Sequence, residues 1–456
     1  MSRLSEWTTT EDGGDADLGP YAVNRDGLPL KVWGLQQKLY AKAQREPRFG
    51  FYALYDRIYR KDVLWAAWSR VAANDGAPGV DGVTIASLLS DEGGALEGLI
   101  EELHTQLRAK TYQPAPVRRT YIPKANGKLR PLGIPTVRDR IAQTAAKLVL
   151  EPIFEADFRP CSYAYRPDRQ AHEAVAQIKS VITQGRIEVL DADLSSYFDT
   201  IPHDKLMRCV EKRVSDGSVL QLIRLWLRAP IVDRTDDGPP QRPTKGTPQG
   251  SVVSPLLANI YLHWLDKLFY AESGPGCWAN ARLIRYADDF VICARYVGAR
   301  IRAWLSELMG RMDLTLNEEK TAVVRLDNDH AAFDFLGFTF RRARSKLHDG
   351  RFCVVTPSSA AVIRFQGELT AATGPKYSFV PTTDLIGMVN ARLAGWREYF
   401  EYGYSSQARR KIDHHARGRL VRHLKRRSQR PYRPPKGMSW YRHLLELGLI
   451  RIGARK

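Results

Sequence analysis

Residues 283–293 read Leu-Ile-Arg-Tyr-Ala-Asp-Asp-Phe-Val-Ile-Cys, and this stretch decides how the middle of the chain is interpreted. Two adjacent carboxylates, Asp288 and Asp289, lie between two short apolar runs, each of which predicts a strand. The pattern predicts a tight hairpin with the acids at its tip. Adjacent carboxylates repel one another when both are ionised, and a divalent metal ion is the obvious neutraliser. Because Asp is also common in ordinary turns, a metal site requires partners elsewhere in the chain.

The bulk composition favours a nucleic-acid partner. The chain has 456 residues, 44% of them hydrophobic, and a formal net charge of +19. This length predicts two or three domains, and the charge indicates a polyanion, nucleic acid before membrane. Residues 1–20 hold five acids against one Arg, which predicts a disordered acidic tail rather than a targeting peptide. Five cysteines without a Cys-x-x-Cys pair argue against a zinc site and fit a reducing, cytoplasmic setting.

A third acid is predicted close to the hairpin tip. Residues 187–203 begin as a strand and pass into a turn and a short helix. Asp191 and Asp193 are two positions apart, so they face the same way on an extended strand. One strand can therefore present an acid toward Asp288. Asp199 follows the strand and is expected to be a cap or turn residue.

Two further segments indicate phosphate binding. Residues 117–124 and 129–135 predict two strands joined by an Asn-Gly turn, and this ribbon could lie over phosphates or be a solvated hairpin. Residues 245–251 form a Gly/Pro loop before a helix over 255–270, where Ser251 and Ser254 are expected N-caps. A helix start is a natural site for a phosphate or nucleotide. The cations of the ribbon are Arg118, Arg119, Lys124, Lys128 and Arg130.

The C-terminal part differs in composition. Residues 405–456 hold sixteen Lys or Arg residues against two acids. Charge of one sign at this density repels itself unless a polyanion is near. His414 and His415 lack further ligands at suitable spacing, so a basic helix is the better interpretation than a metal site. Further helices are predicted over 33–60, 63–73, 88–107, 138–154, 204–213, 219–228, 298–312 and 383–400, and an aromatic hairpin over 333–340.

The order of these motifs and their residues resemble those of reverse transcriptases, specifically bacterial group II intron-encoded reverse transcriptase/maturases. The resemblance covers about residues 33 to 430. Tyr286-Ala287-Asp288-Asp289 matches the family's Tyr-x-Asp-Asp box, and residues 193–199 match its first acidic motif. Residues 390–400 resemble the maturase, or thumb, signature. Residues 162–167 depart from the family, with Ala164-Tyr165 in place of Gly-Phe, which leaves the details of template contact open.

The resemblance implies roles for single residues. Asp193 and Asp288 would ligate two Mg²⁺ ions, with Mn²⁺ as a substitute, Asp289 would assist, and the Leu194 carbonyl would complete a metal shell. Lys124 and Arg130 would grip the incoming triphosphate, Phe198 would exclude a ribose 2′-hydroxyl, Gln249 would lie beside the nucleotide sugar, and Lys320 would protonate pyrophosphate. Leu336, Gly337 and Phe338 would form the primer grip. RNA is expected at Arg409, Arg410, Lys411, Arg422, Lys425, Arg426 and Arg427.

The implied fold is α+β, a right-hand polymerase whose fingers and palm carry antiparallel sheet, followed by an α-helical thumb and a basic C-terminal tail. The expected divisions are a disordered acidic tail (1–27), an N-terminal extension with the start of the fingers (28–103), fingers and palm (104–341), a connection (342–380), a helical thumb or maturase domain (381–430) and a nucleic-acid-binding tail (431–456).

The resemblance implies an RNA-directed DNA polymerase that binds intron RNA or its lariat in a ribonucleoprotein and assists splicing and retromobility. Its other partners would be an RNA template with a DNA primer, dNTPs and target DNA, with no membrane. The family's frequent His-Asn-His endonuclease domain is not expected here, so primers would come from nicks or replication forks. A bacterial cytoplasmic location is expected, with nucleoid association during work on DNA. The sequence leaves monomer and dimer open.

Three alternatives remain at this point. An RNA-binding maturase with little polymerase activity is disfavoured because all three acids are present. A domesticated, defence-associated reverse transcriptase would use the same chemistry, and the sequence does not separate it from the first reading. An RNA-templated RNA polymerase is disfavoured by Phe198.

Overall fold

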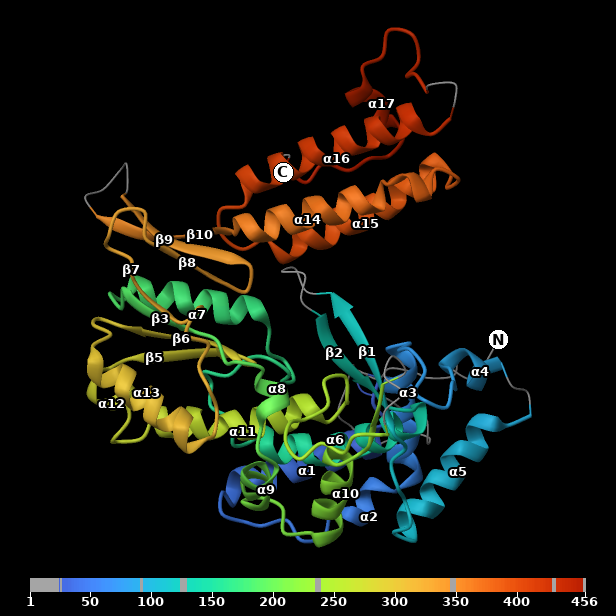
Figure 1. Ribbon diagram of the computed structural model, residues 1–456, viewed down its shortest axis with the longest axis vertical. Helices are drawn as coiled ribbons and strands as arrows, with labels where there is room; N and C mark the ends of the chain where they lie inside the picture. Colours follow the sequence, from blue (N-terminus) through green and yellow to red (C-terminus); the bar gives the residue numbers. More distant parts are fainter. Residues whose placement is uncertain are drawn as a thin grey trace. The chain divides into compact units, whose positions relative to one another are not determined.

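The computed structural model describes residues 24, 27–90, 93–123, 129–233, 239–344, 350–428 and 432–453. The chain forms two compact units. The first contains residues up to 169, 192–290 and 298–321, and the second contains 170–191, 291–297 and the residues from 322 onward. Each unit is described by itself (Figure 1). Most of the predicted acidic tail lies outside the described residues.

The first unit is built around the buried helix α6. Helices α1 and α3 both pack against it, and Thr136 caps it by accepting a hydrogen bond from the Asp139 amide. The helix predicted over 33–60 ends at Arg45, and the one predicted over 88–107 is interrupted by Gly93-Gly94, where Gly94 has a φ of 85°. The helices are α1 (Leu30–Arg45), α2 (Tyr55–Ile58), α3 (Lys61–Ala73), α4 (Ile85–Ser90), α5 (Ala95–Arg108) and α6 (Val137–Glu155).

The predicted cationic ribbon is confirmed as a pair of antiparallel strands. Strands β1 (Val117–Pro123) and β2 (Leu129–Ile134) pair so that Ile122 lies opposite Arg130, and β4 (Ile231–Val232) joins β1 in parallel. The turn between β1 and β2, which includes Lys124 and Lys128, lies outside the described residues.

Further helices of the first unit follow the ribbon in the chain. They are α8 (Tyr197–Thr200), α9 (His203–Glu211), α10 (Gly217–Leu227), α11 (Ser254–Phe269), α12 (Pro275–Trp278) and α13 (Ala299–Arg311). The predicted caps of α11 are wrong: Val253 occupies the N-cap position, and no side chain caps the helix. Ser251 Oγ instead donates to Gln143 Oε1 at 2.7 Å, a partner in α6 that local sequence cannot reveal.

The predicted acidic hairpin is confirmed. Strands β5 (Arg282–Tyr286) and β6 (Asp289–Ala294) flank a two-residue turn, in a four-stranded sheet of order β5-β6-β3-β7. Strand β3 (Glu188–Ala192) pairs antiparallel with β7 (Ala322–Arg325). The apolar residues of β5 and β6 are almost fully buried, as their uninterrupted apolar runs predict.

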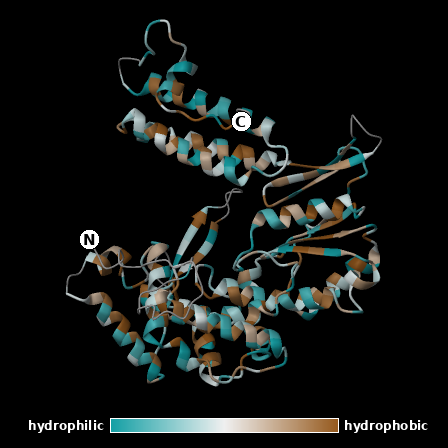
Figure 2. Ribbon diagram, turned by 180° about the vertical axis from the view of Figure 1, so that it is seen from behind, coloured by the Kyte–Doolittle hydropathy of each residue, from teal (hydrophilic) through white to brown (hydrophobic). Residues whose placement is uncertain are grey.

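The second unit combines a small sheet with a set of helices. Strands β8 (Ala332–Phe335), β9 (Phe338–Arg344) and β10 (Arg351–Pro357) form an antiparallel sheet, and β8–β9 is the predicted aromatic hairpin. Hydrophilic and hydrophobic residues alternate along α14, α15 and α16 (Figure 2). The helices are α7 (Ala171–Thr183), α14 (Ser359–Ala372), a 3-10 turn (Pro375–Tyr377), α15 (Thr382–Tyr399), α16 (Ser406–Arg426) and α17 (Trp440–Glu446).

The described residues 432–453 are folded, in the segment where the sequence predicts a tail. Helix α17 packs on α16, and Leu444, Leu449 and Ile452 are buried. Apolar residues spaced through this basic segment therefore form a small core, which the number of charged residues does not predict. None of the helices in the described part of the chain is both long and apolar enough to cross a membrane.

A fully buried ion pair lies at the base of the acidic hairpin. Arg285 in β5 and Asp266 in α11 are both 0% exposed, and they make a bidentate pair with N–O distances of 2.9 and 2.6 Å. Arg285 Nη1 also donates to Asn259 Oδ1 at 3.0 Å. Removing one member of such a pair leaves an uncompensated buried charge.

We expect Asp266→Asn to destabilise the protein by about 3–5 kcal/mol, because the Arg285 charge loses its counter-ion. Urea unfolding measures this change. The matched control is Glu211→Gln, which breaks a surface pair with Arg224 at 2.8 Å and should cost about 0–1 kcal/mol. Equal effects of the two substitutions would show that the buried pair is not a structural anchor.

Candidate active site

The hairpin turn holds its acids in a fixed orientation. Ala287 adopts the left-handed region with a φ of 57°, and its carbonyl accepts a hydrogen bond from Arg285 Nη1 at 3.0 Å. Asp288 follows in the turn and is half-buried, whereas Asp289 is exposed. The buried pair Arg285–Asp266 thus anchors the backbone immediately before the acids.

Asp193 lies directly after β3 and is fixed by the segment after α13. Its carbonyl accepts from the Asn317 amide at 2.8 Å, and its carboxylate accepts from Asn317 Nδ2 at 3.2 Å and Lys320 Nζ at 2.8 Å. Leu194 forms an antiparallel bridge with Leu316. The hydrogen bonds that flank this bridge use the backbone groups of Asp193 and Ser195, not the Leu194 carbonyl.

Electrostatic coupling brings the predicted acids together. Burial raises the pKa of Asp288, and the Asp193 carboxylate raises this pKa further, while Arg130 and Lys320 oppose the shift. The hydrogen bond to Asp193 raises the pKa of Lys320, and both hairpin acids add to that shift. Asp193, Asp288, Asp289, Arg130 and Lys320 therefore form one coupled cluster.

The donor chemistry of this cluster fits a hard divalent cation. Carboxylate and carbonyl oxygens are the ligands that such ions prefer, and two mutually repelling carboxylates gain from a cation between them. In the described residues, no group of three or more His, Cys, Asp or Glu side chains has converged as a metal site. Lys320 supplies the positive charge beside Asp193 instead.

Several predicted nucleotide-binding residues lie in the same unit. Phe198 stands in the one-turn helix α8, with its ring 6.5 Å from that of Tyr165. Asp199 lies inside α8 and is not its cap, so that prediction is wrong. Its Oδ2 instead accepts a hydrogen bond from Gln249 Nε2 at 3.1 Å and orients that side chain. Arg130 is exposed on β2, and Lys124 lies outside the described residues.

The ribbon and the Gln249 loop are in direct backbone contact. The Gly133 amide donates to the Gln249 carbonyl at 2.6 Å. Gly250 has a φ of 109°, and a Cβ atom there would lie 2.5 Å from the Gly133 carbonyl oxygen. Only glycine accommodates both the backbone conformation and the close approach.

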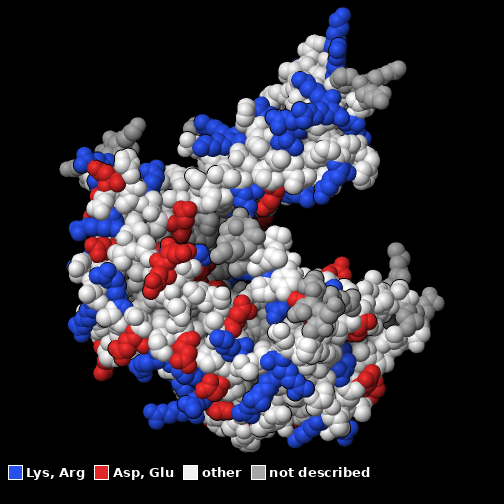
Figure 3. Space-filling view, in the orientation of Figure 1, with Lys and Arg blue, Asp and Glu red and all other residues white. Residues whose placement is uncertain are grey.

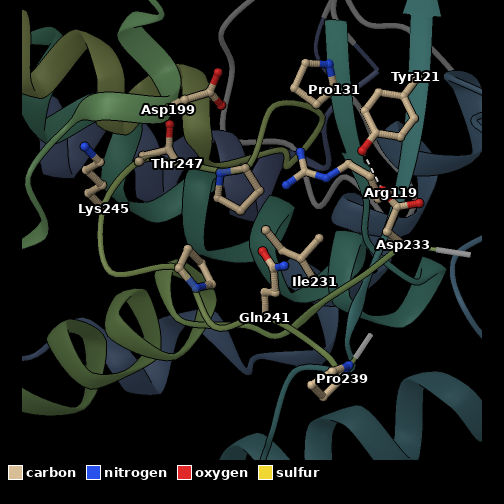
Figure 4. A pocket seen from close by; sticks show the side chains of 13 residues that line it. Arg119, Tyr121, Pro131, Asp199, Ile231, Asp233, Pro239, Gln241, Lys245 and Thr247 are labelled. Carbon is tan, nitrogen blue, oxygen red and sulfur yellow. Dashed lines mark hydrogen bonds between the residues drawn. The ribbon is translucent and has the colours of Figure 1, made fainter. Parts of the chain in front are cut away.

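A cavity of about 440 Å³ lies between the ribbon and residues 245–248 (Figure 4). Arg119 and Lys245 bring positive charge to it, and Asp199 and Asp233 bring negative charge. Tyr121 donates to the Asp233 carboxylate. The cavity therefore adjoins the Asp199–Gln249 contact and has polar groups that can meet a nucleic-acid strand.

The predicted primer grip lies in the second unit. Leu336 and Gly337 form the β8–β9 turn, with φ values of 51° and 78°. The Leu336 carbonyl accepts from Tyr399 Oη at 3.0 Å. Phe338 is fully buried, with its ring 4.9 Å from Phe400. Its side chain is part of the core, so only the turn before it can reach a ligand.

The predicted RNA-binding cations divide into two groups. Arg409 donates to the carbonyls of Arg397 and Phe400, and Arg427 donates to Thr382 Oγ1, so both support α15. Figure 3 shows Lys and Arg gathered over the C-terminal helices. The exposed members of the predicted set are Arg410, Lys411, Arg422, Lys425 and Arg426.

The sequence interpretation missed Arg285, Asn317 and the pairing of Asp199. Arg285 had a visible signal, because a charged residue within a buried apolar strand requires a partner. Asn317 had no such signal, since its position opposite Asp193 depends on the antiparallel bridge of Leu194 with Leu316.

Comparisons with known proteins agree with this geometry. Residues 122–340 match the family "Reverse transcriptase (RNA-dependent DNA polymerase)", and residues 362–440 match "Group II intron, maturase-specific domain". The chain is 35% identical to Protein YkfC of Escherichia coli over 374 residues, which is 74% of this chain and 95% of YkfC. It is 37% identical to the group II intron-encoded protein LtrA of Lactococcus lactis over 219 residues, which is 48% of this chain and 35% of LtrA.

The first match contains Asp193, Asp288 and Asp289, and the second contains α15 and α16. Together with the coverage of YkfC, these matches show that the chain belongs to the reverse transcriptases, the RNA-directed DNA polymerases, and carries the maturase-specific domain of group II introns.

Proposed function

We propose that this protein extends a DNA primer on an RNA template with two Mg²⁺ ions held by Asp193, Asp288 and Asp289. Reverse transcriptases use divalent metal ions, and the choice of Mg²⁺ is part of the proposal. The observation that carries it is the coupled cluster of acids, in which Asp193 and Lys320 lie 2.8 Å apart and Asp193 raises the pKa of Asp288.

Asp193 and Asp288 would hold the metal ions, with the Leu194 carbonyl as a further ligand. The ions supply activation of the primer 3′-hydroxyl and neutralisation of the leaving pyrophosphate. Lys320 keeps its proton because Asp193 raises its pKa, so it can donate that proton to pyrophosphate. Asn317 orients the Asp193 carboxylate through a hydrogen bond of 3.2 Å.

The incoming nucleotide would lie between the ribbon and the hairpin. Arg130, with Lys124, would bind its triphosphate, since guanidinium and ammonium groups both pair with phosphate oxygens. Phe198 would exclude a 2′-hydroxyl by its bulk. Gln249, held by Asp199 at 3.1 Å, would contact the sugar, and the adjoining cavity with Arg119 and Lys245 would take the template strand.

The two domain matches imply that the protein binds RNA. We propose that this RNA is a structured intron, bound as a ribonucleoprotein in a bacterial cell, and that the protein assists its splicing. The exposed cations of α16 support backbone recognition of such an RNA. The turn at Leu336 and Gly337 would contact the primer. The functional divisions predicted from the sequence, the location and the oligomeric state stay predictions.

Asp193→Asn and Asp288→Asn should each lower primer extension by about a thousandfold or more. Each substitution removes a carboxylate ligand of the metal ions, and those ions would stabilise the charge that develops during the reaction. Extension of a DNA primer on a homopolymer RNA template with one labelled dNTP measures this. Asp191→Asn is the matched control, since it makes the same change two residues earlier in β3, and it should remain active. Robust extension by Asp288→Asn would refute the assignment of the hairpin acids.

Asp288→Asn should also raise thermal stability at neutral pH without metal. The pKa of Asp288 is raised in the folded state, so ionised Asp288 opposes folding above that pKa. The gain from Asn should be complete above the folded-state pKa and vanish as pH falls below the ordinary Asp value of about 4. Thermal unfolding measured across pH reports the change.

Mg²⁺ supplies a second arm of that experiment. Adding Mg²⁺ should stabilise the wild type by binding the folded state, and should stabilise Asp288→Asn less. The control is Glu307→Gln, which changes an exposed acid on α13. It should have the stability of the wild type without metal, and Mg²⁺ should stabilise it as much as the wild type. Equal stabilisation of the wild type and Asp288→Asn by Mg²⁺ would contradict metal binding at the hairpin.

Crosslinking in the cell of origin, followed by sequencing, should recover a structured group II intron RNA as the main bound species. Reads from the active-site variant Asp288→Asn should show the same RNA, because RNA recognition is assigned to other surfaces. Recovery of phage transcripts or a small host RNA instead would support a defence role and contradict the proposed partner.

A further inference from the structure

The last described residues of the helical unit form a pocket of about 390 Å³ between α16, α17 and the chain end. Three arginines line it: Arg410 and Arg417 from α16, and Arg451 from the chain end. Tyr441, from α17, lies beneath two of them. The guanidinium carbon of Arg417 is 4.8 Å from the centre of the Tyr441 ring, and that of Arg451 is 5.5 Å away.

The chain end is fastened to α15 and α16 by specific hydrogen bonds. Asp413 accepts from the amides of Ile452 at 3.1 Å and Gly453 at 2.8 Å. Asn390 donates to the Gly448 carbonyl at 2.8 Å and accepts from the Ile450 amide at 3.0 Å. Arg451 is therefore carried by a backbone that is held on both sides of it.

Gly453 makes this attachment close. A Cβ atom there would lie 2.8 Å from Asp413 Oδ2 and 3.2 Å from the Arg410 amide nitrogen. The absence of a side chain lets the backbone at Gly453 lie directly against α16. The position of Arg451, which shares the Tyr441 ring with Arg417, is therefore set by the fold.

The pocket has a net positive charge, because its lining holds three arginines against one acid, Asp413. The Asp413 carboxylate already accepts two backbone hydrogen bonds. Within the described ranges, no ion pair joins Arg410, Arg417 or Arg451 to an acid. Asp413 offsets one of the three guanidinium charges, and a bound anion would reduce the repulsion that remains.

We infer that this pocket binds one phosphodiester group of a bound RNA strand. Guanidinium groups pair with phosphate oxygens in a bidentate manner, and the volume is of the size that takes a small ligand. The surrounding residues 405–456 are strongly basic, which favours a polyanionic strand over an isolated anion. The inference rests on the RNA binding proposed above and adds to it a defined contact.

The sequence interpretation assigns Arg410 to RNA binding and residues 431–456 to a nucleic-acid-binding tail, but it does not bring Arg410, Arg417 and Arg451 together around one phosphate. The maturase-specific match ends at residue 440, one residue before Tyr441, so one wall of the pocket lies beyond it. Arg417 and Arg451 are also absent from the cations that the sequence singled out.

The test compares single substitutions in the full-length protein by fluorescence anisotropy, with a labelled single-stranded RNA of about twenty nucleotides and DNA of the same sequence. Arg417→Gln and Arg451→Gln should each weaken RNA binding about three- to tenfold and reduce the salt dependence by about 0.7 per lost contact. Arg451 is exposed, so its replacement is expected to leave folding intact, which thermal unfolding checks.

The matched control is Arg442→Gln on α17, whose side chain is 75% exposed and pairs with Glu446 at 3.1 Å. It removes the same charge outside the pocket and should change affinity less than about twofold. Effects of Arg417→Gln and Arg451→Gln no larger than twofold would overturn the inference.

A loss of affinity for DNA but not for RNA would also overturn it. So would displacement of the RNA from the wild type by inorganic phosphate at low millimolar concentration. If the wild type itself fails to bind RNA, the proposed function fails, and the two failures are thus distinguishable.

Discussion

The constraint on which the site depends is that acids must be held together against their own repulsion. Asp288 lies in a half-buried turn, and the charge of Asp193 adds to burial in raising the pKa of Asp288. The fold resists this repulsion with backbone anchors on either side. Arg285 holds the carbonyl before the hairpin acids, and Asn317 holds both the carbonyl and the carboxylate of Asp193. The active site is consequently a place where the protein gives up stability for chemistry.

Much of the fold could be predicted because the local spacing of apolar and polar residues determines the helices and strands. The apolar runs around Asp288 predict the hairpin, and the Asn-Gly turn predicts the ribbon. The apolar face of α15 is visible as Leu385, Val389 and Leu393, which are buried as expected. Local pattern fails where a distant partner competes. Ser251 resembles a helix cap, yet it bonds to Gln143 at 2.7 Å, more than one hundred positions earlier in the chain.

The candidate site divides in the same way. The acids, Phe198 and Gln249 could be proposed from the sequence because their motifs are contiguous, whereas the residues that hold them in place are distant in the chain. The basic residues show most clearly that composition alone does not predict which side chains are available to bind nucleic acid. The sequence assigns RNA binding alike to all seven cations named between Arg409 and Arg427, but Arg409 and Arg427 hold α15. In the basic tail predicted over 431–456, Leu444 is in a core. Which cations remain available for a ligand depends on packing, and packing is not a property of the local sequence.

The glycine contact between ribbon and loop determines how the nucleotide site can move. The Gly133 amide and the Gln249 carbonyl are 2.6 Å apart, and Gly250 allows no Cβ atom between the two segments. A rigid displacement of the ribbon therefore either carries Gln249 with it or breaks this hydrogen bond. If the ribbon carries Gln249 with it, binding of the triphosphate and binding of the sugar would depend on one another. Arg130, proposed to bind the triphosphate, and Gln249, proposed to contact the sugar, would then move together. A nucleotide of the wrong shape would therefore weaken the binding of its own phosphates.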